Sequence, residues 1–291
     1  MRRLLSRRAL LLGGLAARAC LAQQSLPASS SSEKDWVCPM DPDYRSDKPG
    51  VCPRCGMKLV LGVPDRIEYP LEITHSPELL QPGAIASLTL RAVNPANGES
   101  VTRFEIVHEK LIHLFVVSEN LSFFAHIHPV LQQDGSFRQQ VRLPYGGMYR
   151  LLADFYPSGS VPQLATGTLY VSGDCDKRAL APALAPYRAE NLTAALRTEP
   201  EQPLAGLETR LFFTLHPSAG LQPYLGAWAH MLAASEDLID LIHLHPFLAA
   251  GDAYMQFNVI FPRPGLYRVW TQVQRQNVVN TLVFTIPVKA L

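Results

Sequence analysis

The fold is decided by the stretch Leu111-Ile-His-Leu-Phe-Val-Val-Ser-Glu-Asn-Leu-Ser-Phe-Phe-Ala-His-Ile-His-Pro129, which recurs as Trp228-Ala-His-Met-Leu-Ala-Ala-Ser-Glu-Asp-Leu-Ile-Asp-Leu-Ile-His-Leu-His-Pro246. A constant offset of 117 aligns the two stretches without a gap, and 7 of their 19 positions are identical. Further along, Pro144–Arg150 matches Pro262–Arg268 at an offset of 118. Self-similarity at one spacing indicates that a structural unit is duplicated.

Each copy is built from short β-like segments separated by turns rich in Gly, Pro or Asn. In the first copy these segments are Ala86–Val93, Leu111–Ser118, Phe137–Leu143 and Tyr149–Phe155. Regular short strands in a unit of about 100 residues are typical of a sandwich. We therefore expect an all-β protein with two tandem immunoglobulin-like antiparallel β-sandwich domains, at residues 66–172 and 203–291. A partly helical linker is expected between them, at residues 173–202.

The histidines of each copy fall on a predicted hairpin. Ser118–Leu121 and Ser235–Leu238 have the composition of turns, and folding the chain about the first turn sets His113 opposite His126 or His128. His126 and His128 share a strand face because side chains alternate with period two. Three imidazoles on one patch form a ligand set for zinc or copper. The candidate ligands are His113, His126 and His128, and in the second copy His230, His243 and His245.

An alternative reading treats these imidazoles as hydrogen-bonded polar groups of a core or a sheet edge. Their neighbours in sequence are largely apolar, as Leu114, Phe115 and Val116 illustrate. The remaining histidines fall outside the repeated pattern and are expected to be ordinary surface residues. These are His75, His108 and His216.

A second group of candidate ligands lies between Trp36 and Leu59. This segment contains Cys38-Pro-Met-Asp41 and Cys52-Pro-Arg-Cys55, and a gap of two residues lets a tight turn aim both side chains at one ion. The candidate ligands are Cys38, Cys52 and Cys55, with Asp41 at the fourth position and Met40 and Met57 nearby. Thioethers favour Cu(I) or Ag(I) over zinc. A disulfide or a thioredoxin-like redox pair is the alternative.

The cysteine segment resembles the short heavy-metal-binding domain at the N-termini of copper- and silver-transporting P-type ATPases and in periplasmic adaptor subunits of metal efflux systems. That family's pattern is aromatic-x-Cys-Pro-Met-His-Pro, followed by Lys-Pro-Gly-x-Cys-Pro-x-Cys-Gly-Met-x-Leu. The chain follows this pattern from Trp36 to Leu59 but has Asp41 where the family has histidine. The resemblance implies a metal-binding domain at residues 36–62 and, as a partner, a metal-efflux component.

The duplicated part of the chain is similar to a family of secreted bacterial proteins of unknown activity. Its motifs include His-x-His-Pro and Phe-Pro-x-Pro-Gly-x-Tyr, which match His243–Pro246 and Phe261–Tyr267. Proteins of that family often carry the short heavy-metal domain. The similarity covers most of residues 80–290 and implies no reaction.

Residues 1–22 have the three parts of a secretory signal peptide. They hold five arginines and no acidic residue, an apolar run at Ala9–Ala17, and small residues before a cleavage point after Ala22. Ser6–Leu10 resembles the twin-arginine export signal, and residues 23–35 form a serine-rich flexible tether. We expect an exported protein, periplasmic or extracellular, without a transmembrane segment once processed. If Cys20 is lipidated, the protein is tethered to a membrane.

Charge and motifs narrow the class of function. The formal net charge is +1, but without the five leader arginines 21 basic residues face 25 acidic ones, which disfavours nucleic-acid binding. Nucleophile-elbow, phosphate-loop and dinucleotide motifs do not occur, so we expect no enzyme. The sequence favours an exported protein of periplasmic metal handling or tolerance that binds a heavy-metal ion, copper or silver before zinc. The alternatives are a non-catalytic β-sandwich interaction module and, less favoured, a histidine–metal enzyme.

Overall fold

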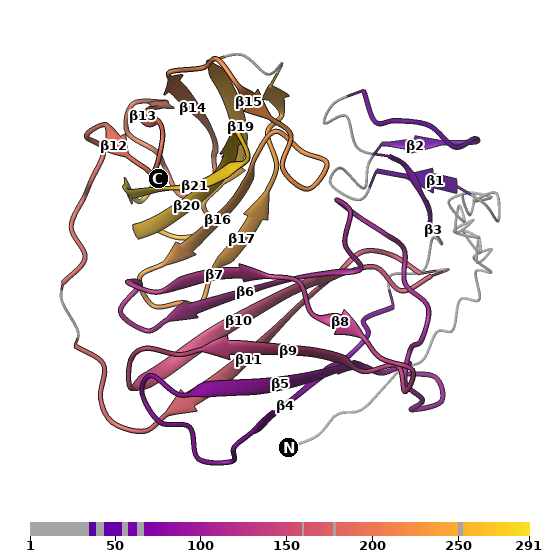
Figure 1. The fold of residues 1–291 in the computed structure, drawn as a ribbon. Helices are drawn as coiled ribbons and strands as arrows, with labels where there is room; N and C mark the ends of the chain where they lie inside the picture. The colour runs from indigo at the N-terminus through magenta and orange to yellow at the C-terminus, as the bar shows by residue number, and fades with distance from the viewer. Residues whose placement is uncertain are drawn as a thin grey trace, which may run out of the picture. The chain divides into compact units, whose positions relative to one another are not determined.

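The computed structural model describes residues 35–38, 44–53, 58–62, 67–158, 160–176, 179–249 and 253–291. Over these residues the secondary structure is entirely β, with strands β1–β21 arranged in five antiparallel sheets (Figure 1). Because this part of the chain holds no helix, it has no helical segment able to cross a bilayer. The expectation of an all-β protein is confirmed.

The first repeat is a sandwich of two four-stranded sheets. One sheet has the order β4-β5-β9-β8, formed by Leu71–Ser76, Ile85–Ala92, Phe137–Arg142 and Val130–Leu131. The other has the order β11-β10-β6-β7, formed by Gln163–Val171, Gly147–Phe155, Ile112–Ser118 and Phe124–Ile127. Lettered along the chain, these orders are ABED and GFCC′, which is the immunoglobulin arrangement. The core between the sheets includes Leu88, Leu114, Phe137 and Leu151.

The second repeat has the same order of equivalent strands, with β12 and β15 as additions. One sheet has the order β12-β13-β14-β19-β18, formed by Tyr187–Arg188, Thr193–Glu199, Glu208–His216, Tyr254–Ile260 and Leu248–Ala249. In the other sheet β20 pairs with both β16 and β21, β16 pairs with β17, and β15 pairs with the end of β20. These strands are Leu221–Gln222 (β15), His230–Ser235 (β16), Leu241–Leu244 (β17), Gly265–Arg275 (β20) and Val278–Val288 (β21). The prediction of two tandem immunoglobulin-like sandwiches is therefore confirmed.

The expectation of a partly helical linker at residues 173–202 is wrong for the described part of that segment. Strands β12 and β13 lie within it, and both belong to the second sandwich, which therefore begins before residue 203. Pro182 and Pro186 interrupt any helix in this alanine- and leucine-rich stretch. Beyond them Leu192 and Ala194 are buried in the core of the second sandwich.

Each repeat also has a tyrosine corner, a feature of immunoglobulin-like sandwiches. The hydroxyl of Tyr149, near the start of β10, accepts a hydrogen bond from the N–H of Tyr145 (2.8 Å) and donates to its carbonyl (3.0 Å). In the second repeat the hydroxyl of Tyr267 accepts from the N–H of Arg263 (3.3 Å). This shared corner explains the sequence match at an offset of 118.

The predicted hairpin turns form in both repeats. Leu121 and Leu238 adopt positive φ values of 57° and 55°, and each turn is closed by a side-chain acceptor. Oδ1 of Asn120 accepts from the N–H of Ser122, and Oδ1 of Asp237 accepts from the N–H of Ile239, both at 3.1 Å. The turns fix the registers that pair Phe115 with His126 and Leu232 with His243.

Strand β6 is buried along its whole length because each of its two faces packs against a hydrophobic cluster. Leu114 and Val116 belong to the core of the first sandwich. The alternate residues Phe115 and Val117 belong to a cluster shared with the second repeat, at whose edge the Phe124 and Trp270 rings stack at 5.0 Å. The cluster consists of Phe115, Val117, Leu121, Leu152, Leu232, Ala234, Leu238 and Trp270.

The two repeats contribute equivalent positions to this shared cluster. At the offsets of 117 and 118, Phe115 corresponds to Leu232 and Leu152 to Trp270. The two sandwiches belong to one compact unit of the chain and meet through the same sheet of each, the one that contains β6 or β16. This pairing of like surfaces is isologous, as in a two-fold dimer.

The cysteine segment is a small three-stranded sheet of order β2-β1-β3. Its strands are Arg45–Ser46, Asp35–Val37 and Val60–Gly62. Cys38 and Cys52 are fully buried in a cluster with Leu59, against which Trp36 and Tyr44 pack. Two of the three predicted thiolate ligands therefore lie in one small core.

Replacing Trp270 by alanine should lower the free energy of unfolding by about 3–5 kcal/mol, because the indole is 3% exposed and belongs to the cluster that the two repeats share. Urea unfolding followed by fluorescence or circular dichroism measures the change. Tyr170→Ala is the control, since Tyr170 is 71% exposed on β11, and should change stability by less than about 0.5 kcal/mol. A loss under about 1 kcal/mol for Trp270→Ala would contradict the packing described.

Candidate metal centres

The first repeat brings three imidazoles together. His113 is on β6, His126 is on β7, and His128 lies just beyond the end of β7. Nδ1 of His113 lies 3.0 Å from Nε2 of His126 and 3.2 Å from Nε2 of His128, and the two Nε2 atoms are 3.3 Å apart. We call these residues the first trio. The structure thus places all three histidines as the hairpin reading requires.

The outer nitrogens of the first trio are held by hydrogen bonds. Nε2 of His113 contacts the carbonyl of Val107 at 3.0 Å, and Nδ1 of His126 contacts Oε1 of Gln272 at 2.8 Å. Both partners are acceptors, so both of these ring nitrogens carry the proton and donate. The amide of Gln272 is oriented by its own donation to Oγ1 of Thr281 (3.3 Å). Ligand histidines in metal sites are commonly oriented by such bonds.

The inner nitrogens are consequently left with lone pairs that converge. Nδ1 of His113 and Nε2 of His126 face one another at 3.0 Å, and neither carries a proton. A single N–H on Nε2 of His128 would have to be shared between these two acceptors, at 3.2 and 3.3 Å. Buried acceptors in this arrangement are stabilised by a cation placed between them. The first trio therefore fits a metal ion held by three imidazoles with one position open.

In the second repeat, equivalent hydrogen bonds hold the outer ring nitrogens of His230 and His243. Nε2 of His230, on β16, contacts the carbonyl of Tyr224 at 3.0 Å, and its Nδ1 lies 2.8 Å from Nε2 of His245. Nδ1 of His243 donates to Oδ2 of Asp154 at 2.8 Å. Asp154 on β10 and Gln272 on β20 are equivalent at an offset of 118. Each repeat thus orients a histidine of the other.

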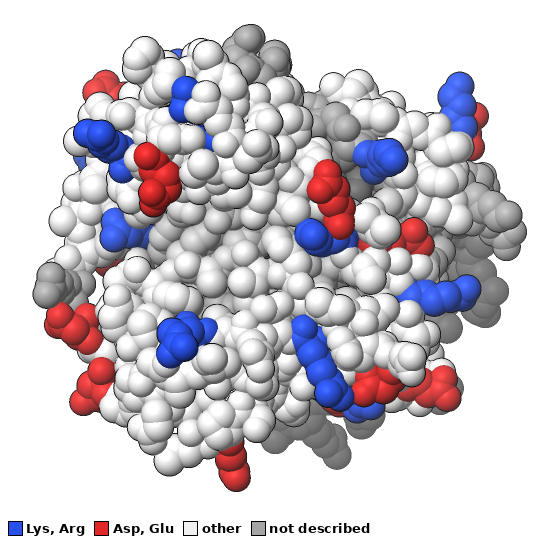
Figure 2. Space-filling model, in the orientation of Figure 1, with Lys and Arg blue, Asp and Glu red and all other residues white. Residues whose placement is uncertain are grey.

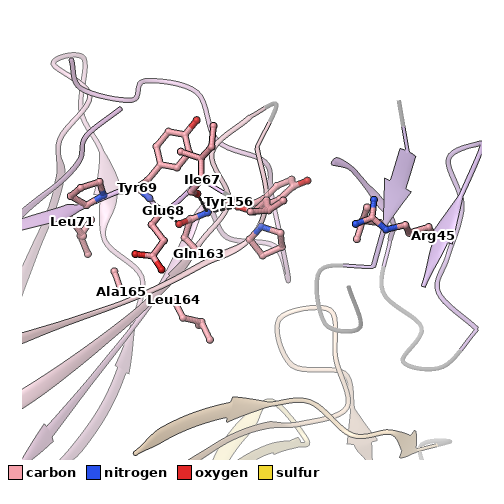
Figure 3. A pocket seen from close by; sticks show the side chains of 13 residues that line it. Arg45, Ile67, Glu68, Tyr69, Leu71, Tyr156, Gln163, Leu164 and Ala165 are labelled. Carbon is pink, nitrogen blue, oxygen red and sulfur yellow. Dashed lines mark hydrogen bonds between the residues drawn. The ribbon is translucent and has the colours of Figure 1, made fainter. Parts of the chain in front are cut away.

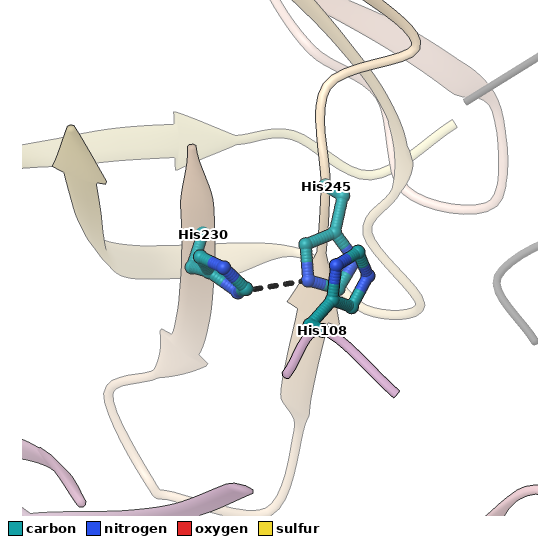
Figure 4. A group of neighbouring side chains, drawn as sticks. All are labelled: His108, His230 and His245. Atoms are coloured by element: carbon teal, nitrogen blue, oxygen red, sulfur yellow. Dashed lines mark hydrogen bonds between the residues drawn. The ribbon is translucent and has the colours of Figure 1, made fainter. Parts of the chain in front are cut away.

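The second group departs from the sequence prediction in one member. The ligand nitrogens that come within 4.8 Å of one another belong to His108, His230 and His245 (Figure 4). His108 belongs to the first repeat, and its ring packs on that of His245 with centroids 3.7 Å apart. We call these three residues the second trio. His243 has its ring 6.0 Å from that of His230 and bonds Asp154 instead.

The expectation that His108 is an ordinary surface residue is wrong, because its side chain is only 8% exposed. Its backbone has φ 49° in a turn closed by the paired residues Val107 and Lys110, just before β6. The equivalent position in the second repeat is Leu225, with φ 51°. Because only one copy has histidine there, the alignment of the repeats contains no signal for this residue. His216 is exposed, and His75 on β4 bonds the carbonyl of Pro77 (2.9 Å).

Burial keeps the trios neutral. Removal from water, reinforced by neighbouring imidazoles, lowers the pKa of His113 to about 4 and of His126 to about 2. The same causes lower the pKa of His108 and of His128 to about 3 each. For His230 and His245 they place the pKa well below its ordinary value. Neutral imidazole is the form that binds metal.

Asp154 carries a charge into this region. Burial alone would raise the pKa of its carboxyl group, but the hydrogen bond that His243 donates and the electrostatic attraction of that side chain outweigh burial and hold the pKa below its usual value. At neutral pH a carboxylate therefore accepts from Nδ1 of His243. The Nε2 atom of His243 is buried and has no hydrogen-bond partner.

The cysteine site is described in part. Cys38 and Cys52 share a buried core, as stated above. Four other predicted ligands lie outside the described residues, namely Met40, Asp41, Cys55 and Met57. Their role remains a prediction from sequence.

Family models match three parts of the chain. The model described as "Heavy metal binding domain" matches residues 36–60. The model described as "Domain of unknown function (DUF8832)" matches residues 67–172 and again residues 188–290, which together exceed half of the chain. The chain belongs to the DUF8832 family. Both family resemblances inferred from sequence are confirmed, and the heavy metal binding domain supports binding of a heavy-metal ion.

Outside the family models, the similarity of this DUF8832 protein to known proteins is weak. No curated protein matches it. Solved structures that match the chain include the adhesin FdeC of Escherichia coli, at 14% identity and a TM-score of 0.26 over 79% of this chain and 68% of that one. The adhesin InvE of Yersinia pseudotuberculosis is 10% identical, with a TM-score of 0.24 over 75% of this chain and 60% of that one. The fibronectin(III)-like modules of CbhA from Clostridium thermocellum are 9% identical, with a TM-score of 0.21 over 75% of this chain and 95% of that one. Scores this low carry no functional argument.

The described chain also has a pocket that is separate from the candidate ligands. Tyr69, Tyr156, Gln163 and Leu164 line it, together with Val37 and Arg45 of the cysteine segment (Figure 3). Among the described residues that line this pocket there is no histidine or cysteine. A different, shallower groove runs past His126 and Gln272 and gives the first trio contact with solvent.

The stability of the metal-free protein should fall as pH is lowered from about 7 to 5. The buried histidines of the trios take up a proton in the unfolded chain near pH 6.5 but not in the folded protein, so acid favours unfolding. Each such histidine adds a slope of about 1.4 kcal/mol per pH unit. Urea unfolding of chelator-treated protein at several pH values measures that slope.

Two variants control this experiment. His126→Gln/His128→Gln should reduce the slope, since it removes two of the titrating groups. Trp270→Ala lowers stability without removing an imidazole and should keep it. A stability that does not change between pH 7 and pH 5 would contradict the burial of neutral histidines.

Proposed function

We propose that this protein is an exported heavy-metal-binding protein that acts in periplasmic metal handling or tolerance. The observation that carries the proposal is the geometry of the first trio, whose inner nitrogens converge at 3.0–3.3 Å while two of the outer ones donate to fixed acceptors. The match of residues 36–60 to a heavy metal binding domain supports it independently.

The two kinds of site suit different ions. Thiolates and thioethers are soft ligands, so the cysteine segment is proposed to capture Cu(I) or Ag(I). Imidazoles suit zinc and copper, so the first trio is proposed to hold Cu(II) or Zn(II). An ion in the first trio would use Nδ1 of His113 and Nε2 of His126 and His128. We propose a metal-efflux component as the partner that delivers or receives the ion.

We propose that the protein is not an enzyme. Hydrolysis or redox turnover at the first trio would need a positioned acid or base. The carboxylate that the described structure places beside the histidines is Asp154, which His243 engages at 2.8 Å. Glu119, in the hairpin turn, instead accepts from the N–H of Met148 (3.2 Å).

Export rests on the signal-like residues 1–22, which lie outside the described part of the chain. The surface in Figure 2 agrees with a partner other than nucleic acid, because Lys and Arg are interspersed there with Asp and Glu and form no basic patch on the face shown.

Anaerobic titration of the purified protein with Cu(I), Cu(II) and Zn(II) tests the proposal. Cys52→Ser/Cys55→Ser should remove the Cu(I) site and leave binding of Zn(II) and Cu(II) intact. His126→Ala/His128→Ala should remove one divalent ion per chain and leave the Cu(I) site intact.

Each variant is thus the control for the other, because the two sites share no ligand. Unchanged Cu(I) stoichiometry in the cysteine variant would overturn metal capture by that segment. Unchanged divalent stoichiometry in the histidine variant would overturn the first trio as a site.

Gln272→Ala should weaken binding of Zn(II) at the first trio by about 10–100-fold without changing the stoichiometry, because the side chain orients His126 but is not a ligand. Gln274→Ala is the matched control, two residues along the same strand, where the side chain bonds Gln222 instead. Competition with a chromophoric chelator measures both affinities. Equal affinities in the two variants would show that the bond to His126 has no orienting role.

A further inference from the structure

The second trio draws its three imidazoles from both repeats. His108 precedes β6 in the first repeat, while His230 and His245 belong to the second. They are 8%, 1% and 6% exposed, so all three are buried away from solvent. Three neighbouring, buried imidazoles at the contact between two domains require a physical explanation, because isolated buried polar groups are destabilising.

The hydrogen bonds of the second trio leave one buried ring nitrogen without a partner. Nε2 of His230 donates to the carbonyl of Tyr224, so its Nδ1 holds a lone pair directed at Nε2 of His245, 2.8 Å away. Nε2 of His108 is buried and has no hydrogen-bond partner, although its ring lies against that of His245. Hydrogen bonding among the three residues therefore leaves Nε2 of His108 unused.

The imidazole of His243, close to the second trio, also has a ring nitrogen without a hydrogen-bond partner. Nδ1 of His243 donates to Asp154, and its Nε2 is also buried without a partner. Its ring lies 4.6 Å from that of His245. Buried nitrogens of two histidines thus remain available around the pair formed by His230 and His245.

We propose that His108, His230 and His245 form a second metal site, shared between the two repeats, for a borderline divalent cation such as Zn(II) or Cu(II). The ligand set contains only nitrogen, with no thiolate or thioether in the trio, and this composition favours such ions over Cu(I) or Ag(I). A bound ion would replace the hydrogen bond between His230 and His245, with Nε2 of His245 giving up its proton, and would also use the unpartnered Nε2 of His108. Because its ligands come from both sandwiches, the ion joins them.

The two trios should differ in how fast they exchange metal. His126 and His128 are only partly buried, and His126 lines a solvent-exposed groove, whereas each member of the second trio is buried. An ion in the second trio is therefore released more slowly to a chelator than an ion in the first. This difference separates the sites without any substitution.

The test uses Zn(II) with the full chain carrying Cys52→Ser/Cys55→Ser and His126→Ala/His128→Ala, which removes the sites of the proposed function. One Zn(II) per chain should remain. Adding His108→Leu should weaken its binding at least tenfold, and adding His245→Gln instead should do the same. Leucine is chosen because Leu225 occupies the equivalent position at nearly the same φ.

His216→Ala in the same background is the control, since His216 is exposed on β14, and it should keep the bound ion. Circular dichroism verifies that each variant is folded, and His108→Gln replaces His108→Leu if the leucine variant is not. In the otherwise unaltered chain, release of Zn(II) to a chelator should show two phases, and His108→Leu should abolish the slow one.

The result that overturns the proposal is equal Zn(II) affinity with and without His108→Leu. If His245→Gln still weakened binding in that case, the site would lie in the second repeat only. These outcomes are separate from failure of the first trio. In that case His126→Ala/His128→Ala would leave divalent stoichiometry unchanged while His108→Leu still lowered it.

Discussion

Burial of one face of β6 and β16 between the two sandwiches is the constraint on which the other features depend. Strands at this position alternate between two cores, so each residue that faces the opposite repeat is removed from water. Phe115 and Leu232 tolerate this environment, but His113 and His230, two residues earlier on the same faces, do not unless their nitrogens find partners. The carbonyls of Val107 and Tyr224 satisfy one nitrogen of each ring and thereby fix where the other nitrogen points.

Much of this arrangement follows from the sequence. The constant offset between the copies locates the hairpins, and the period of a strand places His126 and His128 on one face, opposite His113. What the sequence does not contain is the pairing of the repeats. The hydrogen bonds from His126 to Gln272 and from His243 to Asp154 connect the two domains. They join residues that are 146 and 89 positions apart along the chain. Strand periodicity and turn chemistry act locally and do not specify such contacts.

His108 illustrates a second limit. Its side chain is directed by a single turn with positive φ, and the residue lies before the segment over which the copies align. The equivalent Leu225 keeps the backbone conformation but not the imidazole. Asp154 and Gln272 differ in the same way, with a charge in one repeat and a neutral amide in the other. The duplication therefore preserves the scaffold, while two substitutions make the histidine groups chemically unequal.

The contact between like faces has a consequence for how the unit is assembled. A surface that pairs with its own copy is the surface of a homodimer, and a single sandwich with this face exposed would present a hydrophobic patch to solvent. Placing both copies in one chain replaces a bimolecular association by an intramolecular one, at an effective concentration in the ~mM range for a short linker. Pairing then no longer depends on the amount of protein in the compartment. Each half is also free to change independently of the other, which an identical pair of subunits cannot do.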